Sequence, residues 1–105
     1  MSEAAIRPDA PMCVVLLDYV APLDAIDAAL PRHGEWLTAG FAAGHILTCG
    51  RRVPRTGGVI VMRGDADSVA ALSDDDPFIA EGLATRTVIP FTAGMATTAL
   101  QGFFA

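Results

Sequence analysis

The chain has 105 residues, the size of one domain, and 52% of them are hydrophobic against 18% charged. Its formal net charge is −5, and all seven basic residues are arginines, so neither nucleic acid nor an anionic membrane is an expected partner. The absence of lysine excludes Schiff-base chemistry and phosphate capture by a P-loop lysine.

The first half of the chain predicts a strand followed by a long helix. Residues 1–11 are expected to form a flexible extension. The apolar run at residues 12–17 indicates a strand that is buried on both faces. Pro22 suits the first turn of the following helix, Pro31 should break or bend it, and Gly44 suits its end.

The second half alternates strands and helical segments. The expected elements are a strand at 46–50, a turn-rich basic loop at 51–58, a strand at 59–62, a helix at 65–73, a loop or short helix at 74–82 and a strand at 85–91. Either Asp65 or Asp67 can cap the helix at 65–73. Residues 95–105 form a separate C-terminal tail.

The order strand, helix, strand, strand, helix, strand predicts an α+β fold, a ferredoxin-like βαββαβ domain over residues 12–94. Right-handed crossovers place the first and third strands at the centre and both helices on one face. Val14, Leu16, Ile60, Met62 and their alternates make the other face too apolar for water, which predicts a homodimer. The tail, through residues such as Phe103, offers two alternatives: it folds back over the sheet and caps a monomer, or it packs against the partner chain of the dimer.

Cysteine and histidine usage argues against a metal or an organic cofactor. Two histidines and the two cysteines, Cys13 and Cys49, show no ligand spacing, so no metal is expected. Both cysteines fall in predicted strands and are expected to be buried thiols rather than a disulfide. The longest apolar run is far shorter than the ~18 residues of a membrane span, and a cytoplasmic location follows by default.

His33 and Asp76 are the residues best suited to catalysis. A histidine held by an aspartate can transfer protons near neutral pH, because imidazole titrates near ~6.5. Each residue also has a simpler interpretation. His33 can be an ordinary hydrogen-bonded surface histidine, and Asp76, placed before a proline, can accept local backbone N–H groups in a turn.

Candidate substrate contacts lie at the same predicted end of the domain. Arg51, Arg52 and Arg55 of the basic loop can bind a carboxylate or phenolate through their forked donors, unless they form a solvated loop only. Tyr19, at the exit of the first strand, can donate its phenolic proton to a ligand or simply cover that end of the domain.

The motifs resemble the YCII-related family. The matching stretches are His33 with Trp36 and Leu37, residues 44–50, and residues 76–91, which include Asp76, Pro77 and Phe78. The resemblance covers residues 12–91 and implies a dimeric α+β barrel with a histidine–aspartate active site at His33 and Asp76. Members often carry proline where this chain has Arg51, and a small polar residue where it has Cys49.

Two functions follow from these observations. The first is a cofactor-independent lyase or hydrolase that acts on a small molecule, with His33 as base and Asp76 as its orienting partner. One relative in the family is similar to a dehydrochlorinase of chlorinated hydroxyquinols, which implies lyase chemistry. The alternative is a non-catalytic protein that binds a small molecule in the same dimeric barrel.

Overall fold

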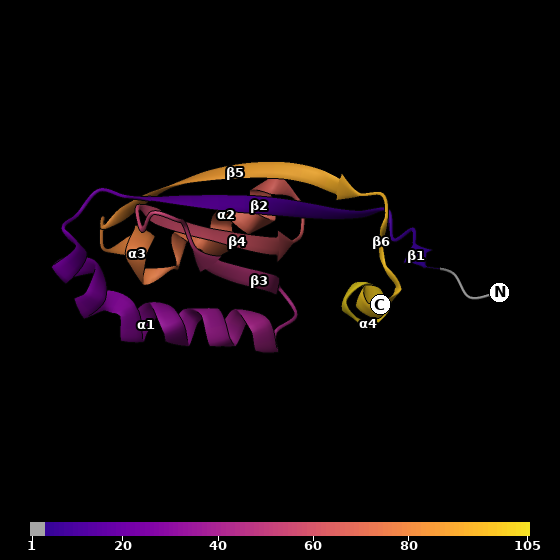
Figure 1. The fold of residues 1–105 in the computed structure, drawn as a ribbon, viewed down its shortest axis with the longest axis horizontal. Helices are drawn as coiled ribbons and strands as arrows, with labels where there is room; N and C mark the ends of the chain where they lie inside the picture. Colours follow the sequence, from indigo (N-terminus) through magenta and orange to yellow (C-terminus); the bar gives the residue numbers. More distant parts are fainter. Residues whose placement is uncertain (1–3) are drawn as a thin grey trace.

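The centre of the molecule is a four-stranded antiparallel sheet with the strand order β3–β4–β2–β5 (Figure 1). The structure is a computed structural model that describes residues 4–105. The elements of the main domain are β2 (Ala10–Tyr19), α1 (Leu23–Ala42), β3 (Ile46–Arg51), β4 (Gly57–Arg63), α2 (Ala66–Asp74), α3 (Pro77–Ala80) and β5 (Ala84–Ala93). The α+β fold and the central position of the first and third predicted strands, β2 and β4, are confirmed.

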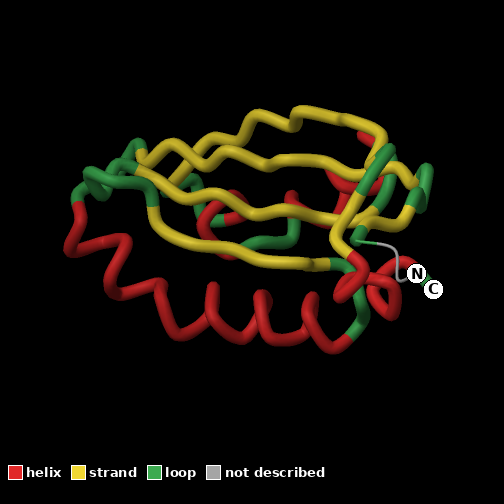
Figure 2. The backbone as a smooth tube through the Cα atoms, turned by 45° about the vertical axis from the view of Figure 1, so that its right-hand side comes forward, coloured by secondary structure: helices red, strands yellow, loops and turns green. Residues whose placement is uncertain are grey.

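Helix α1 runs through Pro31 as one element of 20 residues. Of the predicted break or bend, the break is therefore wrong, whereas the first turns of the helix do run at an angle to the remainder (Figure 2). Proline removes one backbone donor, but Ile26 and Ala29 on the preceding turn are almost fully buried in the core. Tertiary packing on that turn outweighs the loss of a single hydrogen bond. Among the described residues, no helix is long and apolar enough to cross a membrane.

The segment between α2 and β5 contains the short helix α3, one of the two forms expected for it. Asp65 caps α2, because its carboxylate accepts a hydrogen bond from the Ser68 backbone N–H at 2.8 Å. Asp76 caps α3 in the same way, and Pro77 follows at a position where the missing N–H costs nothing. These two caps set where each helix begins.

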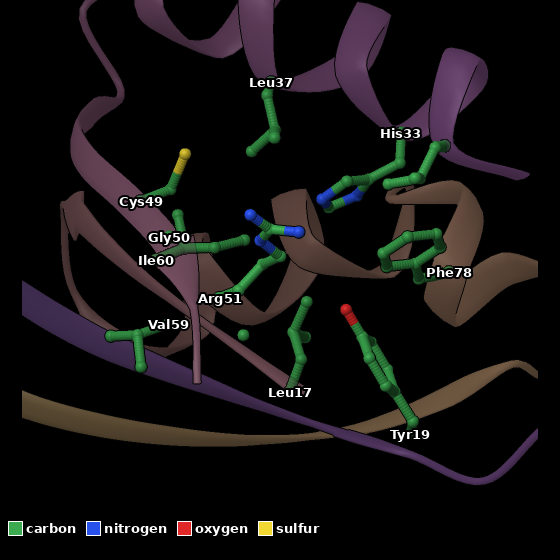
Figure 3. Close-up of a pocket in the computed structure, with 12 residues that line it drawn as sticks. Leu17, Tyr19, His33, Leu37, Cys49, Gly50, Arg51, Val59, Ile60 and Phe78 are labelled. Carbon is green, nitrogen blue, oxygen red and sulfur yellow. The ribbon is translucent and has the colours of Figure 1, made fainter. Parts of the chain in front are cut away.

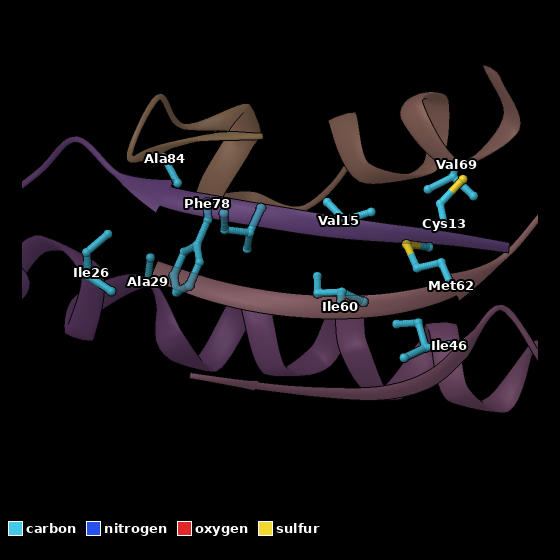
Figure 4. Close-up of a cluster of buried hydrophobic side chains, with 11 residues drawn as sticks. Cys13, Val15, Ile26, Ala29, Ile46, Ile60, Met62, Val69, Phe78 and Ala84 are labelled. Atoms are coloured by element: carbon cyan, nitrogen blue, oxygen red, sulfur yellow. The ribbon is translucent and has the colours of Figure 1, made fainter. Parts of the chain in front are cut away.

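The helices cover one face of the sheet and share a single core with it (Figure 4). Cys13, Val15 and Leu17 of β2 alternate toward this face. Antiparallel pairing sets Met62 opposite Cys13 and Ile60 opposite Val15. Ile60 and Met62 therefore lie in the core with at most 2% exposure, which corrects the expectation that they face away from the helices.

The opposite face of the sheet is apolar and carries no helix. It presents Val14 and Leu16 of β2 and their β4 partners Val61 and Val59, all partly buried. Ile89 of β5, opposite Val14, is 45% exposed. An apolar sheet face of this kind is a typical contact surface between protein chains.

The chain ends form a second, two-stranded sheet. Here β1 (Ala5–Ile6) pairs antiparallel with β6 (Ala96–Thr97), and η1 (Thr98–Leu100) and α4 (Gln101–Phe104) follow. Arg63 of β4 donates a hydrogen bond of 2.7 Å to the Phe103 carbonyl and so ties the tail to the main sheet. The segment expected to be a flexible extension thus contains β1 and the start of β2, and its residues 1–3 lie outside the described residues.

Candidate active site

His33 and Asp76 are joined by a hydrogen bond of 2.7 Å between the imidazole Nδ1 and the carboxylate Oδ1. The His33 side chain is 12% exposed, and that of Asp76 is fully buried. An ionised carboxylate can only accept, so with Asp76 ionised this bond selects the tautomer of His33 that carries its hydrogen on Nδ1. The remaining ring nitrogen, Nε2, then has a free lone pair in the neutral imidazole.

The local fold of α3 places Asp76 beside the middle of α1. Its Oδ1 also accepts the Phe78 backbone N–H at 3.0 Å, as the N-cap of α3. Asp76 therefore makes both expected hydrogen bonds, to His33 and to a local backbone N–H, through one oxygen. The other oxygen, Oδ2, is buried and has no hydrogen-bond partner among the described residues. The carboxyl group of Asp76 is thus held beside the imidazole through one oxygen only.

Aromatic rings hold the imidazole in place. The His33 ring stacks on the Phe78 ring with a centroid distance of 3.9 Å and an interplanar angle of 8°. Tyr19 meets the edge of Phe78 at 5.9 Å, and Trp36 lies 6.5 Å from His33 on the same helix. The stacked ring of Phe78 therefore fixes the plane of the imidazole.

A cavity of about 230 Å³ opens beside the imidazole. Its apolar wall comes mainly from Leu17, Leu30, Leu37 and Ile60. Its polar groups are those of His33, Tyr19 and Arg51, and Figure 3 shows the imidazole, the phenolic hydroxyl and the guanidinium pointing into the same space. Convergent polar groups in an apolar hollow are the usual form of a small-molecule site.

The structure separates the three arginines of the basic loop. Arg51, at the end of β3, lines the cavity. Arg52 and Arg55 do not line it, because they form ion pairs with Asp18 and Asp27. Their position could not be read from the sequence, since the partner carboxylates lie on β2 and α1.

Arg55 still acts on the site indirectly. The pKa of Arg55 is raised, mainly by its hydrogen bond to Asp27 and to a smaller extent by Tyr19. The guanidinium therefore lies close to the phenolic hydroxyl of Tyr19, which is itself part of the cavity wall.

Several residues of the site, among them Phe78, Leu37 and Cys49, were not predicted as site residues from the sequence. Phe78 stacks on His33, Leu37 lines the cavity one helical turn after His33, and Cys49 lines it two residues before Arg51. The signals were present: residues four apart share a helix face, and residues two apart share a strand face. Burial raises the pKa of the Cys49 thiol, so this group is an uncharged part of the wall.

No metal site accompanies the cavity in the part of the chain that the structure describes. Within residues 4–105, no three histidine, cysteine, aspartate or glutamate side chains group as ligands for a metal ion. The chemistry open to the described side chains is proton transfer by His33, together with hydrogen bonding and charge stabilisation by its neighbours.

Comparisons with known proteins agree with this architecture. A family model described as the YCII-related domain matches residues 12–92. No curated protein matches the chain. Among solved structures, the fold is similar to that of 5-chloro-2-hydroxyhydroquinone dehydrochlorinase from Burkholderia phenoliruptrix AC1100, in complex with 2,5-dihydroxybenzoquinone, with a TM-score of 0.61. The two chains are 20% identical, over 77% of this chain and 90% of the other, and at that identity the likeness shows the fold.

Proposed function

The chain belongs to the YCII-related family, and from that premise we propose that it is a small-molecule lyase that uses His33 and Asp76 for proton transfer. The observation that carries the proposal is the 2.7 Å bond from Nδ1 to a fully buried carboxylate, at the wall of an apolar cavity. A surface histidine in a purely structural role needs neither the buried charge nor the cavity. The structural neighbour, a dehydrochlorinase by name, supports an elimination reaction.

The proposed step begins at Nε2 of His33. This nitrogen takes a proton from an O–H or C–H group of the substrate, and the electrons of that bond move into a new π bond. The leaving group departs with the electron pair of its own bond. In the dehydrochlorination of a chlorinated hydroquinone, the ring reacts as the keto tautomer whose C–Cl carbon already carries a hydrogen. The electrons of the O–H bond then form a C=O bond, the adjacent ring π bond shifts to the C–Cl carbon, and chloride leaves. The imidazolium formed is stabilised by the Asp76 carboxylate and by the Phe78 ring stacked on it.

The surroundings of the dyad support this role for His33. Asp76 fixes both the tautomer and the orientation of the ring, and its own position is fixed by the N-terminus of α3. The apolar wall of the cavity excludes bulk water, which strengthens the interaction between imidazolium and carboxylate. A positioned base of this kind contributes about 10²–10⁴-fold to a rate.

The proposed enzyme is a homodimer. Support comes from the helix-free face of the sheet, where Val14, Leu16 and Ile89 form an apolar surface. A symmetric dimer would bury this face on both copies and give the dimeric barrel. The free thiols of Cys13 and Cys49 fit a reducing compartment, so we place the enzyme in the cytoplasm.

The test is chloride release from 5-chloro-2-hydroxyhydroquinone and other chlorinated hydroquinones. The expected result is turnover by the wild type and a loss of about 10²-fold or more in His33→Gln, from removal of the base. His45→Gln is the matched control, because it removes the other histidine and should keep the rate. Failure of the wild type to release chloride from any of these compounds, or a His33→Gln variant as fast as the wild type, would refute the proposal.

A further inference from the structure

Arg51 differs from most other arginines of the chain in having no partner among residues 4–105. Four arginines form ion pairs, namely Arg32 with Glu81, Arg52 with Asp18, Arg55 with Asp27 and Arg86 with Asp74. A fifth, Arg63, donates to a backbone carbonyl. Arg51 makes no ion pair or hydrogen bond through its side chain with any described residue, and it lines the cavity. In a protein of net charge −5, an unpaired cation at the cavity is a site for an external anion.

The strand pairing aims this cation into the cavity. Arg51 lies opposite Gly58 in the β3–β4 ladder, so no β4 side chain occupies the space beside it. Its guanidinium projects into the hollow between Leu37, His33 and Tyr19 (Figure 3). Among the described residues, no carboxylate lines the wall, since Asp76 lies behind His33 and does not line the cavity. The fixed charge that a ligand meets there is that of Arg51.

The rest of the wall restricts the shape of the ligand. A volume of about 230 Å³ lies below the roughly 300–1,000 Å³ typical of sites for drug-sized molecules, so the ligand is compact. The apolar side chains of Leu17, Leu30 and Ile60 suit a ring rather than a polyhydroxylated chain. A guanidinium binds the two oxygens of a planar carboxylate through paired donors.

We propose that Arg51 selects compact ring compounds that carry an anionic oxygen, a carboxylate or phenolate, and orients their acidic proton toward His33. The proposal assigns a substrate class to the site of the proposed lyase, and it rests on that function for the identity of the cavity as a substrate site. Arg51 is here a specificity-determining residue: the anion is held at one wall while the reacting bond faces Nε2 at another.

The test compares two ligands that differ in charge and little in size. Binding of 2,5-dihydroxybenzoate and of neutral 2,5-dihydroxybenzamide is measured by calorimetry at low salt. The wild type is expected to bind the anion at least about 10-fold more tightly, the usual advantage of a charge-assisted hydrogen bond. Arg51→Gln should abolish this preference, and Arg51→Lys should retain part of it. Arg86→Gln changes the net charge equally and should retain all of it.

Two results would overturn the proposal: equal affinity of the wild type for both ligands, or an unchanged preference in folded Arg51→Gln. Thermal unfolding confirms that each variant is folded, and Arg51→Lys provides a second readout. The His33→Gln variant separates this proposal from the catalytic one, because it should lose chloride release and keep the preference for the anion. If the preference holds while the wild type releases no chloride, the catalytic proposal fails alone.

Discussion

Replacing Asp76 should separate its structural role from its chemical one. In Asp76→Ala, two donors lose their acceptor: the Phe78 backbone N–H at 3.0 Å and His33 Nδ1 at 2.7 Å. An unsatisfied buried N–H such as that of Phe78 costs about 1–3 kcal/mol. The His33 side chain is 12% exposed and can turn toward the cavity. Losing its hydrogen bond to Asp76 therefore costs only about 1 kcal/mol of stability. The expected loss in free energy of unfolding is therefore about 2–4 kcal/mol.

Asp76→Asn keeps an oxygen in the position of Oδ1 and so keeps both hydrogen bonds. It should lose only about 1 kcal/mol of stability, while turnover falls with the missing negative charge. For a domain of this size, each kcal/mol of lost stability lowers the melting temperature by about 4 °C. The Asp76→Ala variant should therefore melt about 8–16 °C below the wild type. The single tryptophan, Trp36, lies beside His33 and reports unfolding by fluorescence.

The matched control is Asp75→Ala, which changes an exposed carboxylate one residue away and should alter stability by less than about 0.5 kcal/mol. An Asp76→Ala variant as stable as the wild type would show that the two hydrogen bonds contribute nothing. An Asp76→Asn variant as unstable as Asp76→Ala would show that the charge, rather than the bonds, stabilises the fold.

Three further changes test other parts of the structure. The pKa of Asp65 is lowered, chiefly by the Ser68 N–H, so its cap stabilises the fold above the pKa of the unfolded chain and loses that effect as pH falls through the folded value. Asp65→Ala should thus be less stable than the wild type at neutral pH. Urea unfolding measures the difference in free energy of unfolding between the two proteins, and a difference that does not shrink in acid would contradict this explanation. Because burial raises the pKa of Cys49, iodoacetamide should label this thiol more slowly than free cysteine at pH 8, and the labelling should become faster as the pH rises. A ligand in the cavity, 2,5-dihydroxybenzoate, should slow the labelling, which mass spectrometry follows. The wild type should sediment at twice the 10.9 kDa mass of one chain and Ile89→Glu as a monomer, whereas a monomeric wild type would exclude the sheet-to-sheet dimer.

The parts of the fold that could be predicted from sequence are those set by local patterns. Apolar runs and turn signals identified the strands, and the segment at 74–82 was expected to be a loop or a short helix, the second of which is α3. At Pro31 only the break was wrong, since the local rule ignores the burial of Ile26 and Ala29 that holds α1 together. The assignment of Ile60 and Met62 to the outer face failed because an apolar run does not reveal which alternate residues face the core.

The site was less accessible to sequence reasoning because its parts are far apart in the chain. His33 and Asp76 are 43 residues apart, and only the family pattern linked them. The three arginines of the loop were equivalent in sequence. They differ in the structure because Asp18 and Asp27 lie within reach of Arg52 and Arg55. Ion pairs of this kind depend on tertiary placement, which no local signal encodes.

The protonation of the two His33 ring nitrogens is the most direct test of the proposed base. The chain has only two histidines, so a ¹⁵N-detected imidazole spectrum is simple, and His45→Gln assigns it. In the neutral form of the His33 ring, Nδ1 should carry the proton and Nε2 should be bare. If Nε2 carries the proton instead, no lone pair faces the cavity, and His33 cannot be the base.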